Sequence, residues 1–190
     1  MFDQTQEKII NATMNLIMSK GYTATTTKDI AKQAGINECT IFRKFKGKKE
    51  IVLAAMTLPT WNPNLKKEDF SCHDDLDEDL IAFSNVYLSK VTRQMVKVSI
   101  GLRSQELYPD TMKGIMKIPF VFKEVLIEYF IHMNEKGLIT NHDYEGMAMQ
   151  FLSMNVGFVF LKASFDDRLS EVGQEDYIQS SVNRFICGIR

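Results

Sequence analysis

The chain has few residues suited to disulfide, metal or cofactor chemistry. Only three of its 190 residues are cysteines, namely Cys39, Cys72 and Cys187. They are widely spaced and odd in number, so we expect reduced thiols in a cytoplasmic protein rather than a disulfide framework or a zinc knuckle. The three histidines form no HxxxH or HxH pair, which disfavours a metal effector. We therefore expect no metal and no cofactor.

Long hydrophobic runs are also missing. No stretch of about 18 apolar residues is uninterrupted, so we expect no membrane span. The most apolar segment, residues 147–161, is broken by Gln150, Ser153 and Asn155. The first residues are polar and include two acids, which is unlike the basic and then apolar pattern of a secretory signal.

Recognisable catalytic patterns are absent as well. The sequence contains no GxSxG, GxGxxG, P-loop or HExxH pattern, so we do not expect an enzyme. The acidic run at residues 74–79 has neither the spacing of a calcium loop nor that of a catalytic pair. We interpret it as the charged start of a helix, where carboxylates interact favourably with the helix dipole.

The net charge is close to zero, but the charged residues are unevenly distributed. The formal net charge is −1. Residues 1–50 carry nine Lys or Arg against five Asp or Glu, whereas the other 140 residues carry 14 against 19. Such an asymmetry suggests that a basic N-terminal part and an acidic body have different tasks. The hydrophobic share of 45% is sufficient for a packed core.

The hydrophobic pattern predicts an all-α fold. Helical spacing recurs along the chain, and period-two alternation is nowhere sustained. All four prolines lie between residues 59 and 119, so long helices are allowed on either side. We expect about nine helices, with caps at Thr27, Asn37 and Asp74 and a break at residues 108–110. The expected helices span about 4–20, 28–34, 38–45, 48–58, one bent or two separate rods within 74–102, then 119–136, 143–164 and 174–188.

Residues 25–50 predict a helix-turn-helix. Two short helices flank a tight turn at residues 34–37, and Ile30, Ile41 and Phe45 can share a small core with the first helix. The second helix then presents Arg43 and its neighbours outward, where it can lie in a DNA major groove. Residues 28–49 contain seven basic and two acidic side chains, a concentration suited to phosphate neutralisation.

Residues 6–56 resemble the N-terminal domain of the tetracycline-repressor (TetR) family. The resemblance rests on an ordered set of short motifs, each weak alone but specific together. They are Lys20-Gly21-Tyr22, Thr25-Thr26-Thr27, Ile30-Ala31 followed by Ala34-Gly35-Ile36, the recognition-helix segment Cys39-Thr40-Ile41-Phe42-Arg43-Lys44-Phe45, and Lys48. Phe42 departs from the pattern, because the family usually has a tyrosine there.

The resemblance implies a set of DNA-contacting residues. The expected contacts are made by Thr27, Glu38, Cys39, Thr40, Phe42, Arg43, Lys44 and Lys48. Thr27, Thr40, Lys44 and Lys48 would hold phosphates, and Glu38, Cys39 and Arg43 would reach base edges. Phe42 has no hydroxyl to donate, so it would only pack or touch a sugar.

The resemblance also implies a DNA-binding domain at residues 1–50 and an effector-binding and dimerisation domain at residues 51–190. A homodimer would place two recognition helices on a palindromic operator. The expected interface residues are Phe151, Met154, Phe158, Leu161, Ile178, Val182, Phe185 and Ile186. The alternative is that these stripes only close the core of the monomer.

Aromatic and methionine side chains are frequent in the middle of the chain. Such residues suit a malleable pocket for an apolar or amphipathic effector, although they equally suit an ordinary core. The candidate pocket residues are Phe83, Tyr87, Met95, Met112, Met116, Phe120 and Phe122. We therefore expect a ligand-responsive, dimeric repressor; a small enzyme and a helical adaptor that does not bind DNA are the alternatives.

Overall fold

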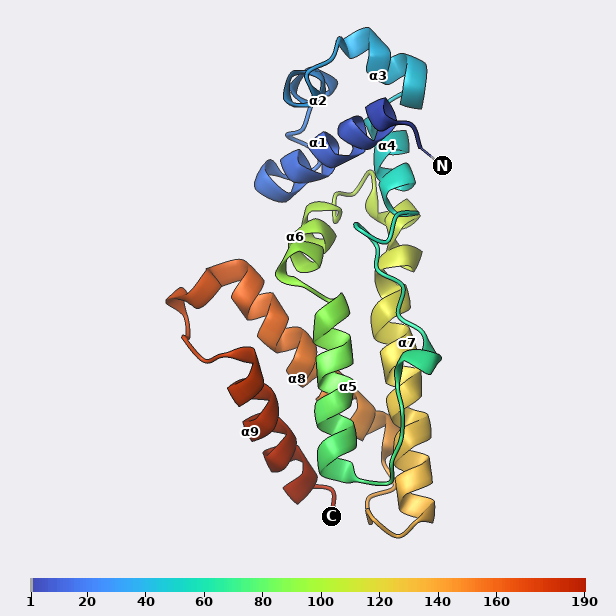
Figure 1. Cartoon of the computed structure of the whole chain (residues 1–190), viewed down its shortest axis with the longest axis vertical. Helices are drawn as coiled ribbons and strands as arrows, with labels where there is room; N and C mark the ends of the chain where they lie inside the picture. The colour runs from blue at the N-terminus through green and yellow to red at the C-terminus, as the bar shows by residue number, and fades with distance from the viewer. Residues whose placement is uncertain (1) are drawn as a thin grey trace. The chain divides into compact units, whose positions relative to one another are not determined.

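The computed structural model describes residues 2–190, and these contain nine α-helices, two short 3-10 helices and no strand (Figure 1). The all-α prediction is confirmed. The helices are α1 (Gln4–Lys20), α2 (Thr27–Ala34), α3 (Glu38–Phe45), α4 (Lys48–Ala55), η1 (Lys67–Asp69), α5 (Leu76–Lys90), α6 (Arg93–Gly101), α7 (Tyr108–Glu135), α8 (Tyr144–Phe165), η2 (Asp166–Arg168) and α9 (Gln174–Cys187).

The chain forms two compact units. The N-terminal unit comprises Met1–Pro63 and Gln94–Met116, and the C-terminal unit comprises Asn64–Arg93 and Lys117–Arg190. A segment from the middle of the sequence therefore completes the unit that contains the helix-turn-helix. The functional boundary near residue 50 stays a prediction.

The core of the N-terminal unit is built around α1. Its apolar positions recur at helical spacing, and Ile10, Met14 and Ile17 are fully or almost fully buried. α1 packs against both α2 and α4. The single tryptophan, Trp61, joins this core and donates from its indole nitrogen to the Asn11 side chain at 3.2 Å.

The caps of the short helices follow local hydrogen-bonding chemistry, with one correction. α2 is capped by Thr26 and not by Thr27, because the Thr26 hydroxyl accepts from the Asp29 amide at 3.1 Å. The Asp29 carboxylate in turn accepts from the Thr26 amide, which completes a capping box. The predicted cap at Asn37 is confirmed: its side chain accepts from the Cys39 amide at 2.9 Å.

The prediction for the start of α5 was wrong by one residue. Asp75 is the cap, and its carboxylate accepts from the amides of Asp77 and Glu78 at 2.9 Å each. Asp74 precedes it with a φ of 63°, which takes its side chain away from the helix end. α5 and α6 are separate helices, since Val91 and Thr92 lie between them.

The expected break at residues 108–110 and the expected start of α7 near residue 119 were also wrong. α7 begins at Tyr108, so Pro109 lies in its first turn, where a missing amide donor costs no helical hydrogen bond. Pro119 lies inside the same helix. α4 is shorter than predicted, since it ends at Ala55 and a turn segment follows.

The C-terminal unit has an aromatic core. Tyr87 and Phe122 stack with their ring centroids 4.5 Å apart, and Phe83 meets Tyr129 edge to face at 4.9 Å. A second group joins Phe151 on α8 to Phe185 on α9 at 5.2 Å. α9 packs along α5 (Figure 1). The aromatic rings therefore fill the space between the helices of this unit.

Candidate nucleic-acid interface

The turn between α2 and α3 fixes which side of α3 is exposed. Gly35 takes a left-handed conformation with φ of 67°, and the Ile36 amide donates to the Ala31 carbonyl at 3.0 Å. Ile41 and Phe45 are buried against the N-terminal core. The opposite side of α3 therefore faces away from the core of this unit.

The exposed side of α3 carries a contiguous set of side chains. Cys39, Phe42, Arg43 and Lys46 are all exposed. Phe42 and Arg43 lie three and four residues after Cys39, and Lys46 lies four and three residues after them, so the four side chains share one side of the helix and its cap. Phe42 exposes 51% of its surface, so its ring is accessible to a partner. Three of the predicted DNA contacts thus share one face.

Two other predicted contacts bind each other. The Thr27 hydroxyl donates to the Glu38 carboxylate at 2.6 Å, and both residues are half-buried. This bond joins the first turn of α2 to the first turn of α3. It uses one oxygen of the Glu38 carboxylate, so the other oxygen can still accept a hydrogen bond.

Lys44 has a partner inside the chain. Its ammonium lies 2.6 Å from the Asp3 carboxylate, and this hydrogen bond lowers the pKa of Asp3. Both side chains remain partly exposed, so the pair is open to solvent and to screening by salt. Thr40, on the preceding turn of α3, is half-buried.

Lys48 binds backbone groups within the N-terminal unit. Its ammonium donates to the backbone carbonyls of Tyr22 and Thr25, each at 2.7 Å, and sits 3.9 Å from the centroid of the Tyr22 ring. Burial lowers the pKa of Lys48. The side chain of Lys48 therefore binds the loop between α1 and α2, and its contact with a phosphate stays a prediction. The start of α4 has no side-chain cap, so its first amides remain available to an anion.

Sequence reasoning missed which basic residues are unpaired. Lys20 and Lys49 form ion pairs with Asp29 and Asp110, at 2.7 and 2.6 Å. Among the described residues, no ion pair involves the exposed cations at positions 28, 32, 43 and 46, which are Lys28, Lys32, Arg43 and Lys46. The number of charged residues in the sequence does not show which of them form ion pairs, because ion pairs depend on how the chain folds.

The predicted interface residues of α8 and α9 divide into two groups. Phe151, Ile178, Val182 and Ile186 are buried within the chain, as the monomer-core alternative expects. Met154, Phe158 and Phe185 are half-buried, and Leu161 is 44% exposed. The dimer interface stays a prediction.

α8 also has an exposed apolar surface. The exposed large hydrophobic residues of this helix are Met149, Phe160, Leu161 and Phe165. A Cβ added at Gly157, on the same helix, would meet no atom within 4 Å. Within the described residues, Tyr144–Arg168 is the one helical stretch apolar and long enough to cross a membrane, a test that core helices of soluble proteins also pass.

The predicted pocket residues are dispersed. Phe83, Tyr87 and Phe122 belong to the aromatic core of the C-terminal unit, in line with the ordinary-core alternative. Met95, Met112 and Met116 belong to the N-terminal unit, and Phe120 is exposed on α7. The pocket stays a prediction.

A cleft of about 580 Å³ lies within the C-terminal unit, at the end of α5 and beside α8. None of the predicted pocket residues lines it. Its walls combine apolar side chains, among them Leu88 and Phe158, with the charged groups of Arg93, Lys162 and Asp167. Lys162 is almost fully buried and lies 2.8 Å from the Asp167 carboxylate.

Comparison with known proteins agrees with this architecture. Residues 9–55 match the family model for bacterial regulatory proteins of the tetR family. The chain is 31% identical over 185 residues to YvkB, an uncharacterized HTH-type transcriptional regulator of Bacillus subtilis (strain 168), covering 97% of each chain.

Solved structures show the same fold. A putative fatty acid metabolism regulator of Clostridium perfringens matches with a TM-score of 0.69 and 20% identity, over 96% of this chain and 98% of that one. AibR, solved in complex with isovaleryl coenzyme A and operator DNA, matches with a TM-score of 0.69 and 20% identity, over 95% and 97%. Together with the 31% identity to YvkB over nearly the whole chain, these findings show that the protein belongs to the TetR family of bacterial transcriptional regulators.

Proposed function

We propose that this regulator is a cytoplasmic, dimeric repressor that binds a palindromic DNA operator and is released by a small apolar or amphipathic effector. The observation that carries the proposal is the exposed face of α3, where Cys39, Phe42 and Arg43 stand together on a helix whose other side is buried. A face of this kind suits insertion into a major groove.

Within this interface, base reading falls to the outermost side chains. Arg43 is exposed and unpaired within the described chain, so its guanidinium is available for a bidentate contact to guanine. Cys39 and Phe42 are apolar enough to meet a thymine methyl or a sugar. Glu38 would serve mainly to hold α2 and α3 together through Thr27.

Phosphate binding falls to groups around this face. The exposed ammonium groups of Lys28, Lys32 and Lys46 join the predicted contacts Thr27, Thr40 and Lys44. At Lys44, a phosphate would replace the Asp3 carboxylate as the partner. Lys48 would contribute the amides at the start of α4, while its side chain fixes the loop behind them.

Dimerisation is needed because one short helix reads only a few base pairs. Two recognition helices about 34–36 Å apart would meet successive major grooves. The exposed apolar side of α8 is the surface that fits a second copy, since an isologous contact would cover Phe160, Leu161 and Phe165 in both chains at once.

The cleft beside α8 is our candidate effector site. Its volume of about 580 Å³ lies within the ordinary range for small-molecule pockets. Arg93 lines it and is also the first residue of α6. The last residue of α6, Gly101, accepts a hydrogen bond at its carbonyl from the amide of Tyr22, in the loop between α1 and α2. An occupant of the cleft can therefore act on the DNA-binding unit through α6.

Binding to DNA tests the proposal. The protein should bind a palindromic site upstream of its own or an adjacent gene, with an affinity that falls steeply as salt rises. Fluorescence anisotropy of labelled duplexes at several salt concentrations measures this, with a scrambled duplex of equal length as the control. Equal affinity for both duplexes would overturn the proposal.

A further inference from the structure

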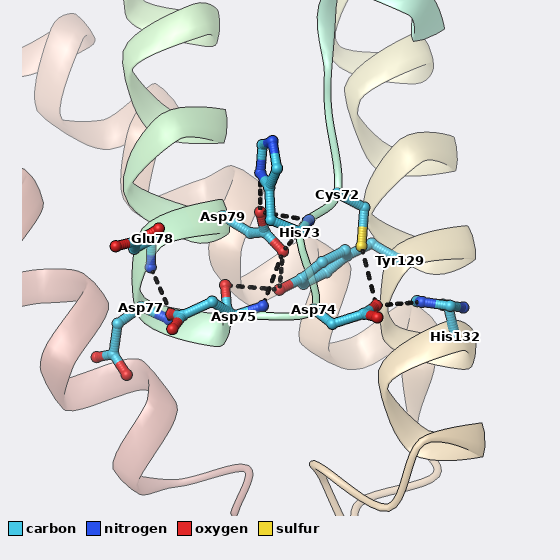
Figure 2. A network of polar contacts seen from close by, with 9 residues as sticks. All are labelled: Cys72, His73, Asp74, Asp75, Asp77, Glu78, Asp79, Tyr129 and His132. Atoms are coloured by element: carbon cyan, nitrogen blue, oxygen red, sulfur yellow. Dashed lines mark hydrogen bonds and ion pairs between the residues drawn. The ribbon is translucent and has the colours of Figure 1, made fainter.

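The segment just before α5 is held in one conformation by a buried carboxylate. Asp79 is fully buried, and its two oxygens accept from the His73 amide at 3.0 Å each. The Asp75 amide adds a bond at 3.3 Å, and the Tyr129 hydroxyl donates to the same carboxylate at 3.3 Å. The backbone on both sides of Asp74 is therefore fixed against α7 (Figure 2).

This arrangement aims the side chains of residues 72 and 74 in a common direction. Asp74 takes a φ of 63°, a left-handed conformation that is uncommon for a residue with a Cβ. The Asp74 carboxylate consequently lies 3.8 Å from the Cys72 sulfur. Figure 2 shows both side chains directed toward α7.

α7 supplies the third donor. Tyr129 and His132 are three residues apart and lie on one side of the helix, and the His132 Nε2 is 2.6 Å from the Asp74 Oδ1. One turn further on, the Lys136 ammonium binds the other Asp74 oxygen at 2.9 Å. The Cys72 sulfur, an Asp74 oxygen and a His132 nitrogen all lie within 4.8 Å of one another.

We propose that Cys72, Asp74 and His132 form a binding site for a divalent transition-metal ion of the zinc class. A thiolate, an imidazole and a carboxylate are the ligand types that Zn²⁺ takes in proteins, and three protein ligands leave the fourth tetrahedral position for water. This proposal departs from the expectation drawn from histidine spacing, because the ligands come from two segments far apart in the sequence. It is independent of DNA binding.

The surroundings fit a cation. Four more carboxylates lie at residues 75–79, so the local charge attracts positive ions. Lys136 would keep its bond to the Asp74 oxygen that the metal does not take, which orients the ligand as an outer partner. Cys72 and Asp74 are exposed, so an ion can enter from solvent without any opening of the fold. A bound ion would fasten the segment before α5 to α7.

Cobalt binding to the full-length, reduced and chelator-treated protein tests the site. Co²⁺ should bind with a stoichiometry of one per chain and give the near-ultraviolet charge-transfer absorbance of a thiolate ligand, and Zn²⁺ should displace it. In Cys72→Ser the absorbance should vanish and the affinity fall by more than about 100-fold, since even outer partners of metal ligands contribute 10- to 100-fold. His132→Gln should weaken binding to a similar extent.

The matched control is the double variant Cys39→Ser with Cys187→Ser, which removes the other two exposed thiols. It should bind Co²⁺ with the absorbance and affinity of the unaltered chain. Because Cys72 is exposed, metal-free Cys72→Ser should unfold at the same temperature as the unaltered protein. A lower unfolding temperature would reveal a folding defect that is distinct from the loss of a metal ligand. Thiolate absorbance that persists in Cys72→Ser, or the absence of saturable one-to-one binding, would overturn the proposal.

Discussion

At the scale of single residues, two donors of the Lys48 ammonium bind backbone carbonyls, those of Tyr22 and Thr25. Lys48→Ala would leave both carbonyls without this partner in a half-buried position. We expect unfolding of the N-terminal unit to become easier by about 1–3 kcal/mol. Fluorescence of the buried Trp61 during urea titration measures this unit specifically.

Lys28→Ala is the matched control for Lys48→Ala, since Lys28 is exposed and has no ion pair among residues 2–190. Its effect on stability should stay within about 0.5 kcal/mol. Both variants should weaken DNA binding. A Lys48→Ala protein with the urea midpoint of the unaltered chain would show that the ammonium does not hold the loop.

Asp29 provides a prediction on pH. The hydrogen bond from Lys20, followed by those from Thr26, lowers the pKa of Asp29 to about 2 from its ordinary value of 3.8. Because the pKa is depressed in the folded chain, its stabilising effect is present above pH 3.8 and is lost as the pH falls through about 2. In Lys20→Ala the pKa should rise toward 3.8, as a carboxyl-carbon NMR titration would detect.

Lys8→Ala is the control for this titration, because Lys8 is exposed on the same helix and has no ion pair within the described chain. It should leave the Asp29 midpoint near that of the unaltered protein. An unshifted midpoint in Lys20→Ala would mean that the Lys20 bond is not formed in solution.

At the scale of elements, α6 approaches α1 at a glycine. A Cβ added at Gly101 would lie 2.8 Å from the Ile17 Cγ2 and 2.9 Å from the Ile17 carbonyl oxygen. Gly101→Ala should therefore displace α6 and destabilise the N-terminal unit by about 1–3 kcal/mol, despite the better helix propensity of alanine. Urea titration with Trp61 fluorescence measures the change.

Gly114→Ala in α7 is the matched control in the same unit. There the nearest atom is the methyl end of Met56 at 3.2 Å, which is flexible and can move aside. We expect a near-neutral effect. A Gly101→Ala protein as stable as Gly114→Ala would contradict the close packing of α6 on α1.

The boundaries of several helices could be predicted from the sequence, and those of others could not. The observed boundaries of α1, α3 and α9 lie within one residue of the predicted ones. Each of these helices ends at a glycine or begins at a clear cap or acidic turn. α7 was misplaced because Pro109 was taken as a break, although proline suits a first turn. The caps at Thr26 and Asp75 were missed because neighbouring residues of the same type compete for the position.

The candidate interface was predictable only in part for a related reason. Residue type and spacing placed Arg43 and Cys39 on the outer side of α3. They gave no information on ion pairs between distant segments, such as Lys44 with Asp3, or on the inward direction of the Lys48 side chain. Such contacts depend on how helices pack, which local patterns do not encode.

At the scale of the whole molecule, the exposed apolar side of α8 predicts self-association. Leu161 is 44% exposed in the single chain, and Leu161→Arg would place a charge in the proposed two-fold contact. We expect this variant to be monomeric by light scattering. Its operator affinity should fall at least about tenfold, because a monomer binds with only one recognition helix.

Leu138→Arg is the control, since Leu138 is a similarly exposed leucine in the turn after α7. It should leave the molecular mass of a dimer unchanged. A Leu161→Arg protein with the mass and operator affinity of the unaltered protein would place the interface elsewhere.

Substitution of Arg43 shows whether the outer face of α3 reads DNA sequence. The measurement is the affinity of Arg43→Ala for the operator and for operators changed at each base pair, compared with Arg168→Ala, whose side chain is 86% exposed in the C-terminal unit. We predict that Arg43→Ala loses about 1–3 kcal/mol of binding and loses discrimination at one guanine position per half-site, while Arg168→Ala binds normally. Unchanged affinity and unchanged base preference in Arg43→Ala would mean that Arg43 on the outer face of α3 does not read DNA sequence.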